Sequence, residues 1–271
     1  MNSCIGFIGG GNMAQAIVTG LIAAGTNPSD IWVSDPNPDC RNALAALGVA
    51  KASDATALMA QADLIVLAVK PQIMRTVATT LAPMVRESQV FCSIAAGVSI
   101  SSLKTHLALT HQPVIRVMPN TPALLGLGMS ALVSNDNLTV EVKDAVTRLF
   151  EACGEALWVE HEDDIDAVTA VSGSGPAYFF LLIEHMVRSA TRLGLKPETA
   201  QQLVQQTAKG AAAMVEQSDV GPEILRQRVT SPGGTTEAAL SVFQDGDFAD
   251  LVDRALIAAR DRATALSKDA G

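Results

Sequence analysis

The stretch that decides the fold is FIGGGNMA at residues 7–14, close to the start of the chain. It follows a short apolar run at residues 4–8 and leads into a segment with helical periodicity at residues 13–24. In this G-x-G-x-x-A pattern Gly9 permits a tight turn, Gly11 lets a pyrophosphate approach the backbone, and the small Ala14 allows the helix to lie close to the strand. The free N–H groups at the start of the helix then face the anion. The pattern predicts a dinucleotide-binding turn, and a purely structural glycine turn is the alternative.

An acidic residue ends the second predicted strand, which covers residues 31–34. Asp35 stands at about the 20-residue distance from the glycine turn at which a carboxylate accepts from the ribose 2′-OH. Such a carboxylate repels a 2′-phosphate and favours NADH, whereas the nearby Ser34 and Arg41 would accommodate that phosphate. The choice between NADPH and NADH stays open at this point. Asp35 also fits a simpler role as a cap or turn residue before Pro36.

Strand and helix patterns alternate up to about residue 160, and strands are absent afterwards. The near-continuous apolar run at residues 62–69 is typical of a parallel strand that is covered on both faces. We therefore predict an α/β Rossmann-type dinucleotide-binding domain over residues 1–160, followed by an all-α domain over residues 161–271. The other predicted strands cover residues 90–94, 114–118, 130–134 and 157–159. The other predicted helices cover residues 139–153, 177–193, 197–216, 223–228, 236–243 and 248–266.

Three predicted strands end in unusual loops. In open parallel sheets the ligand crevice lies beyond the carboxyl ends of the strands, so these loops are candidates for a nicotinamide pocket. Ordinary βα loops with Pro at the first helical position are the alternative. The loop residues that we assign to this pocket are Ala68, Val69, Lys70, Pro71, Ile94, Ala95, Ala96 and Asn120, the last of which would present its amide.

Composition and charge exclude several classes of function. The net charge is −9 and no cluster of Lys and Arg interrupts it, so we expect no nucleic-acid partner. The four cysteines form no C-x-x-C pair and the four histidines have no metal-ligand spacing. We expect reduced thiols, no metal and a cytoplasmic protein, with a catalytic cysteine as a minor alternative. The start of the chain lacks the features of a signal peptide, and we expect no segment long enough to span a membrane.

A polar, glycine-rich segment at residues 229–239 interrupts the apolar helices of the second half. Consecutive N–H groups after Gly233 and Gly234 open the predicted helix at residues 236–243, which makes a site for a carboxylate. The hydroxyl groups of Ser231, Thr235 and Thr236 add polar contacts. A threonine that only caps a packed helix is the alternative.

The chain resembles the pyrroline-5-carboxylate reductase family over essentially its whole length. The resemblance rests on GGGNMA at residues 9–14, AVKP at 68–71, MPNTP at 118–122, DAVTAVSGSGPAY at 166–178 and VTSPGGTT at 229–236. It implies cofactor contacts at Gly9, Gly10, Gly11, Asn12, Met13, Ser34, Asp35, Pro36, residues 68–71 and residues 94–96. It implies substrate contacts at Glu162, Thr235 and Thr236. Arg228 departs from the family, which often has Asn before VTSP, so a cofactor contact there is in doubt.

The resemblance implies the last step of proline biosynthesis, the reduction of 1-pyrroline-5-carboxylate to L-proline by NADPH or NADH. The hydride goes to the imine carbon, and the ring nitrogen takes its proton from solvent, so no obligatory acid residue is required. We expect the hydroxyl of Thr236 to hydrogen-bond the ring nitrogen. The long helices predicted at residues 177–193, 197–216 and 248–266 are too apolar for a solvated monomer domain, so we predict an obligate homodimer. The resemblance implies that the C-terminal helices of two subunits interlock, and that dimers assemble into larger rings up to a decamer.

Two other functions fit part of the sequence. A β-hydroxyacid dehydrogenase has the same two-domain plan, but its catalytic Lys has no counterpart at residues 173–182. A non-catalytic NAD(P)-sensing regulator would not need the polar turn at residues 231–236.

Overall fold

The computed structural model describes residues 4–51 and 54–269, which form two compact units. Unit 1 contains the described residues up to Ser174 and those from Ala258 onward, and unit 2 is Gly175–Ile257. The compact units therefore divide the chain differently from the predicted boundary near residue 160. The reason is that Ile165 and Ala170, which follow the predicted boundary, are almost fully buried in unit 1.

Unit 1 is built on a sheet in which eight strands of the described chain take the order β3-β2-β1-β4-β5-β6-β7-β8. All neighbouring pairs are parallel except β6 and β7, which are antiparallel. The strands are β1 (Ile5–Ile8), β2 (Ile31–Ser34), β3 (Ala50–Lys51), β4 (Leu64–Leu67), β5 (Val90–Ser93), β6 (Val114–Met118), β7 (Gly128–Val133) and β8 (Gly154–Trp158).

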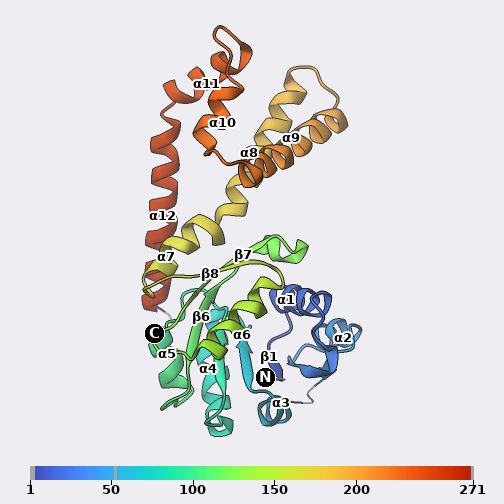
Figure 1. Ribbon diagram of the computed structural model, residues 1–271, viewed down its shortest axis with the longest axis vertical. Coiled ribbons are helices and arrows are strands. Elements are labelled where there is room, and N and C mark those ends of the chain that lie inside the picture. Colours follow the sequence, from blue (N-terminus) through green and yellow to red (C-terminus); the bar gives the residue numbers. More distant parts are fainter. Residues whose placement is uncertain (1–3, 52–53, 270–271) are drawn as a thin grey trace. The chain divides into compact units, whose positions relative to one another are not determined.

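Helices cover both faces of this sheet (Figure 1). One apolar cluster joins β1 to α1 and α6 through residues such as Phe7, Ile17 and Phe150. A second cluster on the other face joins β4 and β5 to α3, α4 and α5 through residues such as Ile65 and Phe91. Every residue of β1 and of β4 is buried, as expected for strands sandwiched between two helical layers. The predicted doubly wound α/β architecture is confirmed.

Several short helices of unit 1 were not predicted individually, because each offers only one or two turns of periodicity. Three of them begin at side-chain caps, where Asn37, Asp54 and Ser99 accept from backbone N–H groups. The helices are α1 (Asn12–Ala23), α2 (Pro38–Ala45), α3 (Ala55–Gln61), α4 (Pro71–Leu81), α5 (Ile100–His106), α6 (Val140–Glu151) and α7 (Asp164–Val168). Short 3-10 turns are η1 (Pro28–Asp30), η2 (Ala82–Met84) and η3 (Thr121–Leu125), and η4 (Thr169–Gly173) is a π-helical turn.

Unit 2 is helical, in agreement with the predicted all-α second half. Its helices are α8 (Gly175–Arg192), α9 (Pro197–Gln217), α10 (Pro222–Arg228), α11 (Thr235–Asp245) and the first part of α12 (Phe248–Asp269). Many large apolar side chains on these helices are exposed in the single chain, including Phe179, Phe180 and Leu181 of α8. Such a surface indicates an interaction face.

One helical stretch, residues 164–192, is long and apolar enough to cross a membrane by length and composition. This corrects the expectation that no segment reaches that length. The expectation was wrong because α7, the π-helical turn and α8 follow one another as one stretch of 29 residues. Length and composition alone do not place a helix in a membrane.

Candidate functional site

The glycine turn lies between β1 and α1, where the ends of two neighbouring strands support it. Gly9 donates its N–H to the carbonyl oxygen of Ser34 over 2.8 Å and has a φ of +101°. A Cβ on Gly9 would lie 2.6 Å from the carbonyl oxygen of Ala68. Gly9 is therefore required by backbone conformation and by close packing.

Gly11 has a different reason to be glycine. It is the N-cap of α1 with an ordinary φ of −69°, and among the described residues no atom lies within 4 Å of a Cβ placed on it. Neither strain nor packing requires a glycine here, so the open space at the start of α1 is available to a ligand. The helix N-terminus gives that space the N–H groups and the positive potential that a pyrophosphate needs. The residues present fit the dinucleotide that the sequence predicts.

Asp35 fastens the glycine turn. Its Oδ2 accepts from Gly10 N over 2.7 Å, and its Oδ1 accepts from Asn37 N over 2.7 Å. The guanidinium of Arg41 donates to the carbonyl oxygen of Asp35. Asp35 thus makes the contacts expected of a cap or turn residue. A carboxylate has about four acceptor sites, so Asp35 can still accept a hydrogen bond from a ribose hydroxyl. A carboxylate and a guanidinium therefore stand at the same corner of the turn.

The predicted loops after β4 and β5 meet at the same edge of the sheet as the glycine turn, because β1, β4 and β5 are neighbours with parallel directions. Lys70 is the N-cap of α4, with Pro71 at its first helical position. We call residues 94–97 the β5 loop. Its Ile94 N–H bonds to Leu67 O over 3.2 Å, and its Ala95 is buried. The sheet thus brings together every predicted cofactor residue that precedes residue 97.

The amide of Asn120 has backbone partners on both sides. Its Oδ1 accepts from Met129 N over 2.9 Å, and its Nδ2 donates to Ser172 O over 3.0 Å. Ser172 belongs to the π-helical turn, a feature that is frequent near functional sites. Asn120 was predicted to present its amide to the cofactor. These bonds brace β7 against the π-helical turn, and the second N–H and second lone pair of the amide keep capacity for the cofactor.

Glu162 belongs to a buried ion network, which we define as Arg116, Glu162 and Asp166. Arg116 has a side chain only 5% exposed, lies 3.2 Å from Glu162 Oε1 and lies 3.9 Å from Asp166 Oδ1. Glu162 also accepts from Ile100 N over 2.8 Å and from Asn135 Nδ2 over 3.1 Å. One cation against two carboxylates gives the network a formal charge of −1.

Arg116 and Asp166 were missed as members of the site. The sequence did carry a signal, because an arginine inside the apolar strand VIRVM must be paired when it is buried. The identity of its partners, 46 and 50 residues further along the chain, required the fold.

The polar turn of unit 2 ends at α11, which begins at Thr235, one residue before the predicted start. Gly234 is the N-cap, and Gly233 has a φ of +69°. Gly233 N donates to Glu237 Oε2 over 2.6 Å, so this turn already holds a carboxylate from its own helix. Glu237 was missed, although a Glu three residues after an N-cap is the capping-box position.

Two of the four thiols, those of Cys92 and Cys153, are buried in the core of unit 1. Burial raises the pKa of the Cys92 thiol and of the Cys153 thiol, which keeps both protonated and unreactive. Within residues 4–51 and 54–269, no group of three or more His, Cys, Asp or Glu side chains is placed to hold a metal ion.

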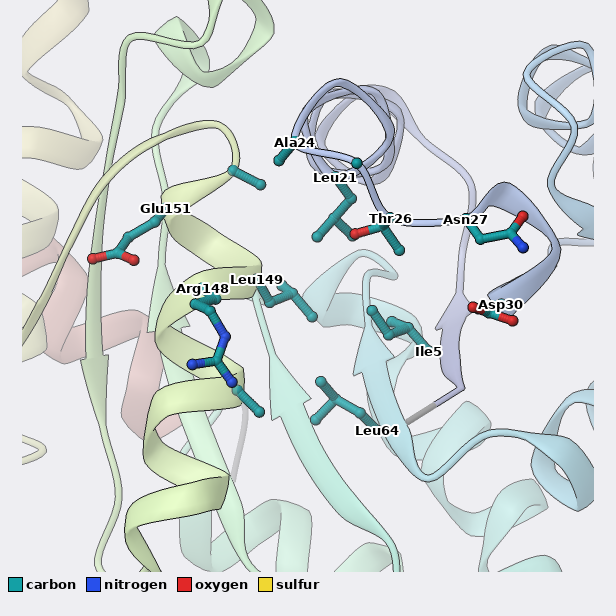
Figure 2. Close-up of a pocket in the computed structure, with 13 residues that line it drawn as sticks. Ile5, Leu21, Ala24, Thr26, Asn27, Asp30, Leu64, Arg148, Leu149 and Glu151 are labelled. Atoms are coloured by element: carbon teal, nitrogen blue, oxygen red, sulfur yellow. The ribbon is translucent and has the colours of Figure 1, made fainter. Parts of the chain in front are cut away.

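A cavity of about 620 Å³ opens at the amino ends of β1 and β4 (Figure 2). Ile5 and Leu64 at the strand ends, Leu21 of α1 and Arg148 of α6 line it. The glycine turn follows the carboxyl end of β1, so this cavity lies at the opposite edge of the sheet. We do not assign it to the cofactor.

Comparison with known proteins gives two family matches and close full-length relatives. A model described as pyrroline-5-carboxylate reductase dimerisation matches residues 162–266, and one described as NADP oxidoreductase coenzyme F420-dependent matches residues 4–97. Pyrroline-5-carboxylate reductase of Pseudomonas aeruginosa is 48% identical over 98% of both chains. That of Pasteurella multocida is 42% identical over 97% of both.

Solved structures agree. A pyrroline-5-carboxylate reductase from Coxiella burnetii matches with a TM-score of 0.94 and 39% identity, covering 98% of this chain and 99% of that one. The pyrroline carboxylate reductase of Plasmodium falciparum, solved with NADP bound, matches with 0.87 and 32%, covering 98% of each chain. A 3-hydroxyisobutyrate dehydrogenase from Mycobacterium tuberculosis matches with 0.52 and 18%, covering 72% of this chain and 67% of that one, and shares the fold alone.

Proposed function

The chain belongs to the pyrroline-5-carboxylate reductase family, and from this premise we propose how its residues divide the work of the reaction. The protein is an NAD(P)H-dependent oxidoreductase that reduces 1-pyrroline-5-carboxylate to L-proline. The observation that carries this function is identity of 48% and 42% to curated reductases over nearly the whole chain. Residues 1–160 serve as the cofactor domain and residues 161–271 as the helical substrate and dimerisation domain.

The cofactor site is formed at the carboxyl edge of β1, β2, β4 and β5. The pyrophosphate sits on residues 9–13, where the open space beside Gly11 supports its placement. The adenosine ribose lies against residues 34–36, with the carboxylate of Asp35 facing its hydroxyls. The nicotinamide lies against residues 68–71 and 94–96. Asn120 contacts the cofactor with the amide capacity that its bonds to Met129 N and Ser172 O leave, and these two bonds hold the amide in place.

The substrate site uses the polar turn before α11. The turn formed by residues 233–236 holds the carboxylate of the imine through backbone N–H groups at the start of α11, and the hydroxyls of Ser231 and Thr235 add polar contacts. Gly233 N already donates to Glu237 Oε2 and Gly234 N to the carbonyl oxygen of Ser231. The N–H groups of Thr235 and Thr236, in the first turn of α11, therefore make this contact. The Thr236 hydroxyl bonds the ring nitrogen. Glu162 contacts the substrate through the carboxylate lone pairs that its bonds to Ile100, Asn135 and Arg116 do not use.

The chemistry asks little of the protein beyond positioning. The bound reduced nicotinamide supplies the hydride. The ring nitrogen takes a proton from water, and the product is the secondary amine of proline.

The protein forms a homo-oligomer, since residues 162–266 match a dimerisation family. We propose that the unit is at least a dimer, with larger assemblies up to a decamer. A second copy, and not lipid, covers the exposed apolar face of α8. We further propose a cytoplasmic protein without nucleic-acid partners, which its net charge of −9 supports.

A steady-state assay tests the function. The purified chain is mixed with 1-pyrroline-5-carboxylate and either NADPH or NADH, and the loss of cofactor absorbance is compared with the L-proline formed. One equivalent of proline per cofactor oxidised is expected, and the two kcat/KM values give the cofactor preference. A chain that binds the cofactor but shows no imine-dependent oxidation is a regulator, and the proposed function is then wrong.

A further inference from the structure

The C-terminal end of α12 belongs to unit 1 and lies beside α7 (Figure 1). Most of α12 is exposed, but Ala263 is buried, with 8% exposure. The last turns of the helix are therefore packed against unit 1. Two contacts from these turns reach parts of the chain that are distant in sequence.

The first contact is a hydrogen bond to the buried ion network. Thr264 Oγ1 donates to Asp166 Oδ2 over 2.7 Å, across 98 residues of sequence. The same hydroxyl lies 3.2 Å from the carbonyl oxygen of Arg260. Its single proton favours the shorter, charged acceptor, because hydrogen bonds to carboxylates are about twice as strong as neutral ones.

The second contact is a close approach to the β5 loop. A Cβ on Gly97 would lie 3.3 Å from the carbonyl carbon of Leu266 and 3.4 Å from its Cβ. Gly97 also has a φ of +74°, which favours glycine. The helix end and the loop are thus packed almost backbone to backbone, so the position of Leu266 limits the positions that Gly97 can take.

The ion network holds the other side of the β5 loop. Ile100 starts α5, three residues after Gly97, and its N–H is bound by Glu162. Glu162 pairs with Arg116, which also faces Asp166. The loop is therefore held from both sides by connected groups, and Thr264 is the link between α12 and those groups.

We propose that Thr264 is a positioning residue for hydride transfer, because it fastens the end of α12 against the β5 loop and so fixes the loop that receives the nicotinamide. The inference rests on the proposed function, since residues 94–96 are its nicotinamide contacts. Thr264 touches neither substrate nor cofactor, and its effect passes through Leu266 and the ion network to the loop.

The test replaces Thr264 by Val, which keeps the size and branching of the side chain and removes the hydroxyl. Thr264→Val should raise the KM for NAD(P)H by roughly three- to tenfold and the KM for the imine by less. The increase is smaller than the full contribution of a hydrogen bond to a charged group, because Thr264 acts on the cofactor only through the β5 loop. Hydrogen exchange of the cofactor-free protein should become faster in residues 94–100. Thr264→Ser should restore both values.

Thr79→Val is the matched control, because Thr79 makes a hydroxyl bond to the carbonyl four residues earlier in α4 and has an exposed side chain. It should leave the cofactor KM and the exchange of residues 94–100 unchanged. The proposal is overturned if Thr264→Val behaves like Thr79→Val, or if Ser fails to rescue. An inactive wild-type chain would instead refute the proposed function and, with it, the positioning role, so the two failures are distinguishable.

Discussion

Replacement of Gly11 by Val separates the binding of the cofactor from the stability of the fold. At Gly11 the backbone has a φ of −69° and a ψ of −178°, which a branched residue adopts readily. Within the described chain no atom lies within 4 Å of the added Cβ. The added Cβ therefore lies in the open space that we assign to the pyrophosphate.

The expected magnitudes follow from this geometry. A less favourable N-cap costs about 1 kcal/mol of unfolding free energy at most. The loss of binding is much larger, because the methyl groups exclude the phosphate from the N–H groups of α1. In the wild type, NADPH at 100 times its Kd stabilises the fold by about 2.7 kcal/mol. At roughly 2–4 °C per kcal/mol for a chain of this size, Tm rises by about 5–11 °C. In Gly11→Val that rise should disappear.

Thermal unfolding with and without NADPH measures both quantities in one experiment. Gly9→Ala provides the contrast, because its Cβ would lie 2.6 Å from a backbone oxygen at a φ of +101°. That variant should lose about 2–5 kcal/mol of stability even without cofactor. If Gly11→Val shows the same NADPH-induced rise in Tm as the wild type, the placement of the pyrophosphate is wrong.

Four further outcomes are expected. Asp35→Ala should weaken both cofactors, because Gly10 N loses its acceptor, but the NADPH:NADH ratio of kcat/KM should rise about fivefold as a repulsion of roughly 1 kcal/mol is removed; an unchanged ratio makes Asp35 a cap only. Thr236→Ala should lose about 5- to 150-fold in kcat/KM for the imine, the equivalent of 1–3 kcal/mol, while Thr236→Ser retains most activity; equal activities at equal folded fraction would contradict the substrate contact. Asn120→Ala should cost about 1–2 kcal/mol, because it leaves a half-buried N–H and a half-buried carbonyl without their partner; a wild-type Tm would show that water replaces the amide. Light scattering at micromolar concentration should give at least a dimer, and a monomeric mass with full activity would contradict the proposed interface.

The backbone of the cofactor site could be predicted because local sequence determines it. The glycine turn combines a buried strand, a φ that favours glycine and a helix start within about eight residues, and each leaves a visible mark in the sequence. The strand at residues 114–118 was predicted at its observed bounds for the same reason, since an apolar run is read without knowledge of its neighbours. The short caps of α2, α3 and α5 were also present, but one or two turns of helix give too little periodicity to identify an element.

Side-chain roles were harder to predict, because a polar residue at a strand end offers the same atoms to a ligand and to the backbone. Asn120 has the composition of a binding residue, yet its amide joins Met129 to Ser172, nine and 52 residues away. Backbone N–H and C=O groups that are shielded from water need hydrogen-bond partners, and a nearby side-chain amide can supply them within the chain itself. Asp35 shows the intermediate case, in which one carboxylate ties the turn and still keeps acceptor sites for a ribose. The residue type therefore identifies which side chains stand at the site, and only the partners in the folded chain decide which of them remain available to the cofactor.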